Sequence, residues 1–176
     1  SPTWEMGAYE ALWAHQKASF KTIADRFRNS PNAIPSELVS EEEIHAALSE
    51  VQDEIARAKI HDFGVRVYGS EDYPERLRDA AHPVELLYYR GWWDLIDSPK
   101  RIAVVGSRTV SDDGIRRTRK LVKLLVQDGY TIVSGLAKGV DTAAHTTAID
   151  NGGSTIAVIG TPITEYYAPE NRALQD

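Results

Sequence analysis

The chain has 176 residues, of which 42% are hydrophobic and 26% charged, a balance typical of a folded protein with a core. It contains no cysteine, which excludes disulfides and thiolate chemistry, and it lacks both a leader and an apolar run of roughly 20 residues, so we expect a cytoplasmic protein without a membrane partner. The net charge of −6 argues against a surface coated with nucleic acid, which would need an excess of lysine and arginine.

An amphipathic pattern covers residues 7–28, where apolar side chains recur at helical spacing from Tyr9 to Phe27. Ser30 and Pro31 interrupt it. The phrase SFKTIADRF in this stretch is similar to the opening of a helix-turn-helix, but such stripes usually pack against a core. We therefore predict a packed helix here.

A second helix is predicted to begin after Ser40, where Glu43 completes a capping box, and to continue through Ile55. The two helices define an N-terminal helical subdomain over residues 1–60, a hairpin or small bundle. We assign residues 61–176 to a second domain.

Short extended segments follow at residues 65–69 and 85–91, where β-branched and aromatic residues are frequent. We expect them to extend the main sheet or cover its edge. Trp92 and Trp93 come next, and they suit either a surface on which bases stack or, more commonly, an anchor that packs two parts together.

Three apolar runs in the second half each end in glycine, at Gly106, Gly135 and Gly160, with intervals of 29 and 25 residues. Each interval accommodates one crossover helix, so the pattern predicts βαβαβ with all three glycine ends along one edge of the sheet. The fold class is thus α/β, with a Rossmann-like, mostly parallel sheet flanked by helices.

The first glycine loop is not the usual dinucleotide motif. Arg108 and Ser111 stand where G-x-G-x-x-G requires glycine, and the second strand ends without the carboxylate that would hold a ribose. The loop instead offers the Arg108 guanidinium, the hydroxyls of Ser107 and Ser111, and backbone N–H groups at a helix start, all of which suit an anion. We expect no cofactor.

The helix predicted over residues 113–127 has two faces. Its apolar face, which packs on the sheet, carries Ile115, Thr118, Leu121, Val122 and Leu125, and its basic face carries Arg116, Arg119, Lys120 and Lys123. Charged residues on the outer face of such a helix usually do no more than face the solvent. The alternative is that they form a track that binds nucleic acid. The local charge favours binding of an anion in this region, because residues 101–123 contain seven basic and two acidic residues.

The second loop lies in SGLAKGVDTAAH, residues 134–145, and places Lys138 between Gly135 and Gly139 just before a helix. It predicts a second anion site beside the first. Asp141 and His145 share a helix face, which allows acid–base or metal chemistry, but no further ligand stands nearby. We favour a hydrogen bond from the loop backbone to Asp141, and we expect neither a metal nor a catalytic residue.

Taken together, these residues resemble the DprA/Smf family of bacterial DNA-processing proteins. Its pattern G-[ST]-R-x-x-S stands here at residues 106–111, S-G-x-A-x-G-[IV]-D-x-x-A-H at 134–145, and G-G-x-T-I-A-V-x-G-T at 152–161. The preceding YPERLRDAAHPVELLYYRG also matches, so the resemblance covers roughly residues 62–174.

The resemblance implies an extended Rossmann domain that binds single-stranded DNA and delivers it to the recombinase RecA during natural transformation and related repair. Consistent with this, we expect a cleft at the sheet edge that can grip phosphates without reading bases. The residues predicted to line it are Gly106, Ser107, Arg108, Ser111, Gly135, Lys138 and Gly139. The resemblance further implies supporting roles for Asp141 and His145 of the second motif, and for Tyr167 and Asn171 near the end of the sequence.

The match is imperfect near the end of the sequence. The family's Tyr-Pro-x-x-Asn stands here as Tyr167, Ala168, Pro169, Glu170 and Asn171, so the tyrosine and asparagine fit while the proline is displaced by one. Family members continue beyond the position of Asp176, and we expect this chain to be a fragment or a reduced relative. A homodimer stays an open expectation, because much of the family's dimer contact lies in that continuation.

Two rival functions fit the same sheet edge. Related Rossmann proteins include nucleotide phosphoribohydrolases, but their P-G-G-x-G-T-x-x-E motif has no counterpart here. The second rival is a sensor domain that binds a small phosphorylated nucleotide in the same cleft and signals to a partner, since one phosphate pocket serves a mononucleotide or a strand.

Overall fold

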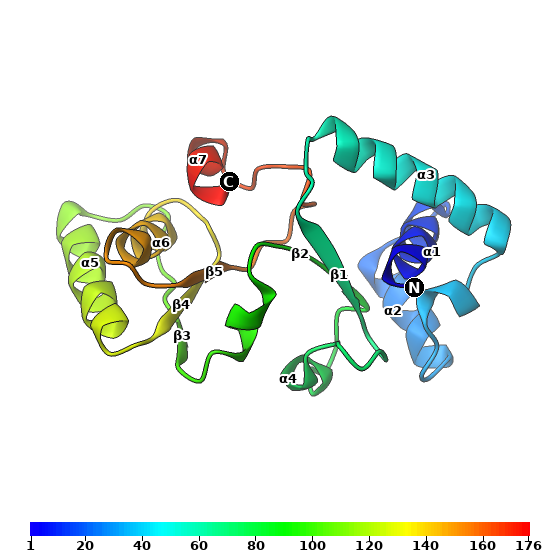
Figure 1. The fold of residues 1–176 in the computed structure, drawn as a ribbon, viewed down its shortest axis with the longest axis horizontal. Coiled ribbons are helices and arrows are strands. Elements are labelled where there is room, and N and C mark those ends of the chain that lie inside the picture. The colour runs from blue at the N-terminus through cyan, green and yellow to red at the C-terminus, as the bar shows by residue number, and fades with distance from the viewer. The chain divides into compact units, whose positions relative to one another are not determined.

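The computed structural model describes residues 1–176, which form two compact units, Ser1–Gly91 and Trp92–Asp176. Figure 1 traces both units from the N-terminus in blue to the C-terminus in red. None of the helices combines the length and hydropathy that crossing a membrane requires.

The first unit begins with two helices, α1 (Pro2–Ala14) and α2 (Phe20–Asn29), where the sequence pattern predicted a single one. That prediction is wrong because the helix is interrupted between them: Lys17 has a φ of 73°, and Ser19 caps α2 in a capping box with Thr22. The break turns Phe20 out of the expected stripe, and 79% of its surface is exposed.

Helix α3 (Glu41–Arg57) confirms the predicted second helix, including the capping box between Ser40 and Glu43. It crosses α1 closely at Gly7, where an added Cβ would lie 2.8 Å from the Cβ of Leu48. Met6 and Ile44 are buried at this crossing. A short 3₁₀ turn, η1 (Pro35–Glu37), connects α2 to α3.

Strands β1 (Phe63–Val67) and β2 (Leu86–Arg90) pair antiparallel with each other in a separate two-stranded sheet, with the short helix α4 (Glu75–Arg78) between them. The expectation that these segments extend the parallel sheet is therefore wrong, because β1 and β2 pair with each other and not with the strands of that sheet. That they cover its edge stays a prediction. Two tyrosines tie this sheet to α1: the Tyr88 hydroxyl donates to Glu10 at 2.5 Å, and Tyr9 donates to Glu85 at 3.3 Å. The domain boundary at residue 60 stays a prediction.

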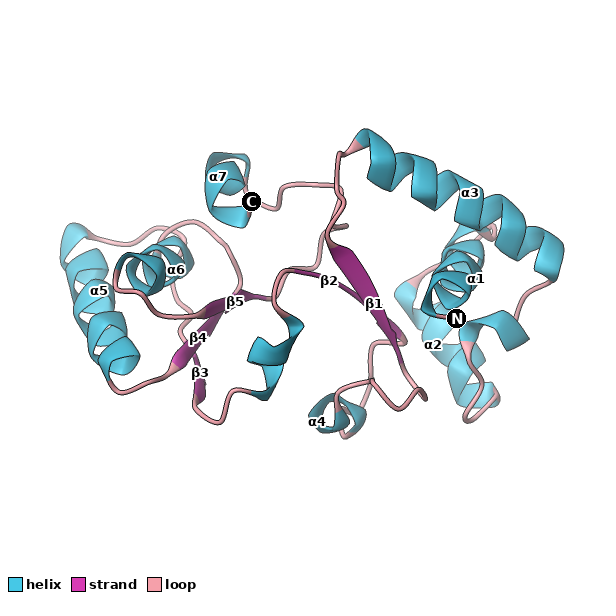
Figure 2. Cartoon of the chain, in the orientation of Figure 1, coloured by secondary structure: helices cyan, strands magenta, loops and turns pink.

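The second unit is built around a parallel sheet in the order β3 (Arg101–Ala103), β4 (Thr131–Ser134), β5 (Thr155–Ala157). The crossovers are α5 (Asp112–Gln127) and α6 (Val140–Asp150). This is the predicted βαβαβ arrangement. The unit also contains η2 (Trp93–Asp97), η3 (Pro169–Asn171) and α7 (Arg172–Gln175), and Figure 2 shows that the chain between β5 and α7 is mostly loop.

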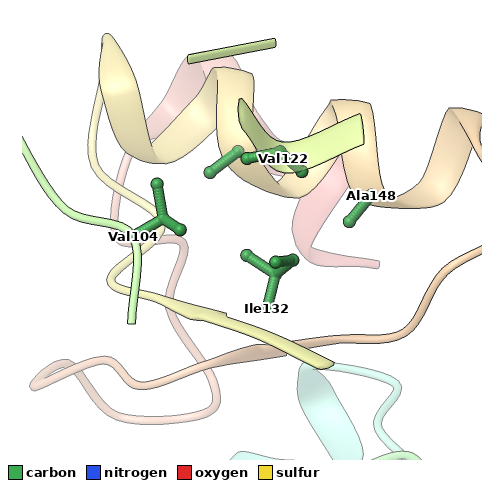
Figure 3. Packing of buried hydrophobic residues seen from close by; sticks show 5 residues of the cluster. Val104, Val122, Ile132 and Ala148 are labelled. Atoms are coloured by element: carbon green, nitrogen blue, oxygen red, sulfur yellow. The ribbon is translucent and has the colours of Figure 1, made fainter. Parts of the chain in front are cut away.

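Both crossover helices pack on the same face of the sheet. Val104 and Ile132 from the strand side meet Val122 of α5 and Ala148 of α6 in one cluster (Figure 3). Leu121 was predicted on this face but is 51% exposed, since it lies on the flank of α5 rather than over the strands. The core thus fixes α5 and α6 against β4, which sets where the loops before both helices lie.

Candidate nucleic-acid interface

The carboxyl ends of the three strands lie side by side. Ladder hydrogen bonds continue past the strands, with Val104 N–H donating to Val133 at 2.9 Å and Val158 N–H donating to Ser134 at 2.9 Å. The Ser134 hydroxyl adds a bond of 2.7 Å to the Val104 carbonyl. The loops that follow β3 and β4, which the sequence singled out, therefore leave the sheet from neighbouring positions.

These two loops pack against each other through glycine. Gly139 has a φ of 78°, and a Cβ there would collide with the carbonyl oxygens of Ser107 and Arg108. A Cβ at Gly106 would lie 2.8 Å from Val140, whose N–H donates to Ser107 at 3.2 Å. Gly106 and Gly139 thus allow the two loops to approach each other, which brings Arg108 and Lys138 to the same edge.

Asp141 shapes the second loop from within. Its carboxylate accepts the N–H of Gly135 at 3.1 Å and that of Ala137 at 3.4 Å, and the residue is 6% exposed. Between these donors, Leu136 adopts a φ of 60°, which is rare for a branched side chain and persists here because its side chain is buried. The predicted hydrogen bond between Asp141 and the loop backbone is confirmed.

Arg108 is exposed at the first loop. One of its terminal nitrogens donates to the Tyr167 hydroxyl at 3.0 Å, and it forms no ion pair with a carboxylate. The two serine hydroxyls are used locally: Ser107 bridges the backbone of Thr109, and Ser111 accepts the Gly114 N–H at 3.1 Å as the cap of α5. The guanidinium is therefore the group of this loop that keeps its charge available.

Lys138 is exposed at the second loop, and its ammonium pairs with Glu170 at 2.5 Å. The lysine holds the pKa of the Glu170 carboxyl below its usual value. Glu170 was not among the predicted site residues, because nothing in a linear motif indicates that this carboxylate folds back onto a lysine 32 positions earlier.

The segment of residues 167–171 is anchored by its last member. Asn171 is 5% exposed, and its amide donates to the Leu136 carbonyl at 3.1 Å and to the Thr142 hydroxyl at 2.8 Å. This anchor explains why Tyr167, predicted as a supporting residue on resemblance alone, reaches Arg108. The segment thus links Tyr167 and Asn171 to the two loops that carry Arg108 and Lys138.

Comparison with known proteins now decides the family. Residues 64–176 match the family model described as DNA recombination-mediator protein A. The chain belongs to this family. It is 48% identical over 104 residues to the DNA processing protein DprA of Streptococcus pneumoniae, a match that covers 59% of this chain and 36% of that protein. It is 44% identical over 106 residues to Protein Smf of a Synechocystis strain, covering 58% and 27% respectively.

Two solved DprA structures are similar as well. The X-ray structure of DprA from Streptococcus pneumoniae gives a TM-score of 0.61 at 32% identity, covering 97% of this chain and 58% of that one. The DprA structure from Helicobacter pylori, which concerns the single-stranded DNA binding mode of that protein, gives a TM-score of 0.56 at 27% identity, covering 64% of this chain and 50% of that one. The chain thus spans only part of the DprA and Smf proteins that it matches.

In this DprA/Smf family member, His145 lies in the core. It is 2% exposed, and its Nδ1 lies 2.6 Å from the Thr155 hydroxyl, which itself donates to the Ile132 carbonyl. Burial lowers the pKa of His145, against the opposing effects of Asp141 and the Ser134 carbonyl. This environment suits a structural role and gives no support to acid–base chemistry.

The basic face of α5 is partly neutralised. Arg116 and Arg117 both pair with Asp113, the latter at 2.7 Å, and Arg117 is a base that the helical projection left out. The remaining bases of this face are exposed and form no ion pair: Arg119, Lys120 and Lys123. No group of three or more His, Asp or Glu side chains in this protein is arranged to hold a metal ion.

Proposed function

We propose that this chain binds single-stranded DNA through its phosphates at the edge formed by the loops after β3 and β4, and that it acts in recombination or natural transformation by delivering the strand to a RecA recombinase. The observation that carries the proposal is the pair of exposed cations on two loops that glycine locks together, Arg108 and Lys138. Homodimerisation and the absence of catalysis belong to the same proposal.

The chemistry of the site favours a phosphodiester strand. A guanidinium grips phosphate with two parallel hydrogen bonds, and an ammonium acts as a compact point charge. The exposed bases of α5 extend the positive surface beyond one phosphate. Phosphate contacts hold a strand without reading its sequence, which suits a protein that must accept any single strand. The DprA of Helicobacter pylori, whose solved structure concerns its single-stranded DNA binding mode, supports the same ligand.

Titration of a fluorescent dT oligomer, compared with duplex DNA and with free nucleotides, tests this proposal. Strand binding predicts a site size of several nucleotides and an affinity that falls steeply with salt. Saturation by one free nucleotide at equal affinity would instead indicate the small-nucleotide sensor and refute strand binding.

The Arg108→Ala variant assigns the site. We expect at least a tenfold loss of oligomer affinity, consistent with loss of one charged hydrogen-bonding group, and a salt slope lower by about 0.7, the share of one phosphate contact. Lys123→Ala, which removes the same charge from the outer face of α5, serves as the control and should have a smaller effect. Unchanged affinity in Arg108→Ala would remove this edge from the proposal, and a larger loss in Lys123→Ala would move the track to α5.

A further inference from the structure

The segment of residues 167–171 contacts both cations of the proposed site, but with side chains of opposite character. Tyr167 accepts a hydrogen bond from Arg108 through a neutral hydroxyl, which leaves the guanidinium charge uncompensated. Glu170 contacts Lys138 through a carboxylate at 2.5 Å, which neutralises it. One segment therefore orients the first cation and occupies the second.

A carboxylate bound to an ammonium resembles a phosphate bound to the same group. Both present anionic oxygens that accept charge-assisted hydrogen bonds, and the single positive charge of a lysine cannot neutralise both at once. Any phosphate that uses Lys138 must therefore share it with Glu170 or displace that carboxylate.

The fold makes such an exchange easy. Asn171 is buried and hydrogen-bonded, so the backbone beside Glu170 is held in place. The side chains of Lys138 and Glu170 remain 61% and 47% exposed. Rotation of the Glu170 side chain is sufficient to release the lysine, and the anchored backbone keeps the carboxylate close enough to return.

We propose that Glu170 is an intramolecular competitor for the phosphate at Lys138, which weakens the grip on DNA and eases its release. This inference rests on the function proposed above. It gives the site two unequal positions, one at Arg108 that is ready for phosphate and one at Lys138 that must first exchange its anion. A protein that hands a strand to a partner benefits from a contact that reverses readily.

The test uses Glu170→Gln in the full chain, which keeps the shape of the side chain and removes its charge. Glu165→Gln is the matched control, because Glu165 lies in the same part of the chain, is exposed and forms no ion pair. We expect Glu170→Gln to bind a fluorescent dT oligomer about two- to fivefold more tightly, the range for an exposed ion pair, and Glu165→Gln to stay near the parent chain. The gain should shrink at high salt, because solution anions then occupy the lysine.

Lys138→Ala and the double variant Lys138→Ala/Glu170→Gln separate this inference from the proposed function. We expect Lys138→Ala to weaken binding and the double variant to match it, since without the lysine the glutamate has nothing to compete for. If Lys138→Ala weakens binding while Glu170→Gln matches Glu165→Gln or binds more weakly, competition is refuted and the proposed function stands. If Lys138→Ala leaves affinity unchanged, both the competition and the role of Lys138 in the proposed function are refuted.

Discussion

Replacing Gly139 with alanine perturbs the contact that holds the two candidate loops together. The residue has a φ of 78° and a ψ of −121°, a conformation that costs a residue with a side chain roughly 1–3 kcal/mol. The added Cβ would also collide with the Ser107 carbonyl and lie 2.8 Å from the Arg108 carbonyl, where ordinary contacts begin at about 3.4 Å. Backbone atoms cannot rotate away as a side chain does, so the loop that carries Arg108 must shift by several tenths of an ångström or more.

Gly129→Ala provides the matched control. Gly129 follows α5 with a φ of 80°, but nothing lies within 4 Å of the position that a Cβ would take there, so alanine brings conformational cost without collision. In urea denaturation we expect a loss of about 1–2 kcal/mol for Gly129→Ala and a larger loss for Gly139→Ala. In oligomer titrations without urea, Gly129→Ala should bind as the parent chain does, while folded Gly139→Ala should bind at least fivefold more weakly. Equal oligomer affinity for the two folded variants would refute the argument that loop packing sets the position of Arg108.

Two further predictions follow from single contacts. Tyr167→Phe removes the hydrogen-bond acceptor of Arg108 without changing charge. We therefore expect the variant to bind the oligomer about two- to fivefold more weakly, which is opposite in direction to the effect of Glu170→Gln. An equal or tighter complex in fluorescence titrations would exclude a positioning role for the hydroxyl. The pKa of Glu43 is lowered from 4.5 to about 2 by hydrogen bonds from the Ser40 backbone, from His15 and from the Ser40 hydroxyl. The ionised carboxylate therefore stabilises the folded state above about pH 4.5, and this stabilisation is lost as the pH falls toward 2. Thermal unfolding of Glu43→Gln should therefore depend less on pH across that window than unfolding of the parent chain, and identical pH profiles would contradict the assignment.

Much of the candidate site was predictable because its determinants are local. A glycine at the end of an apolar run, a serine before a helix and a basic residue between them are adjacent in the sequence, and parallel topology brings successive strand ends to one edge. Arg108 and Lys138 were found in this way. The pairing of Lys138 with Glu170 was not, because it depends on a segment that returns to the loop through the buried amide of Asn171.

The sequence by itself determined the βαβαβ order, the capped start of α3 and the two basic loops, since periodicity, caps and glycine act over a few residues. Only the tertiary structure decided that β1 and β2 pair with each other, that Leu121 stays exposed, and that the glycines at 106 and 139 accommodate a neighbouring loop. These outcomes depend on which distant backbone and side-chain groups meet, and a pattern read along the chain carries no information about the partner across space.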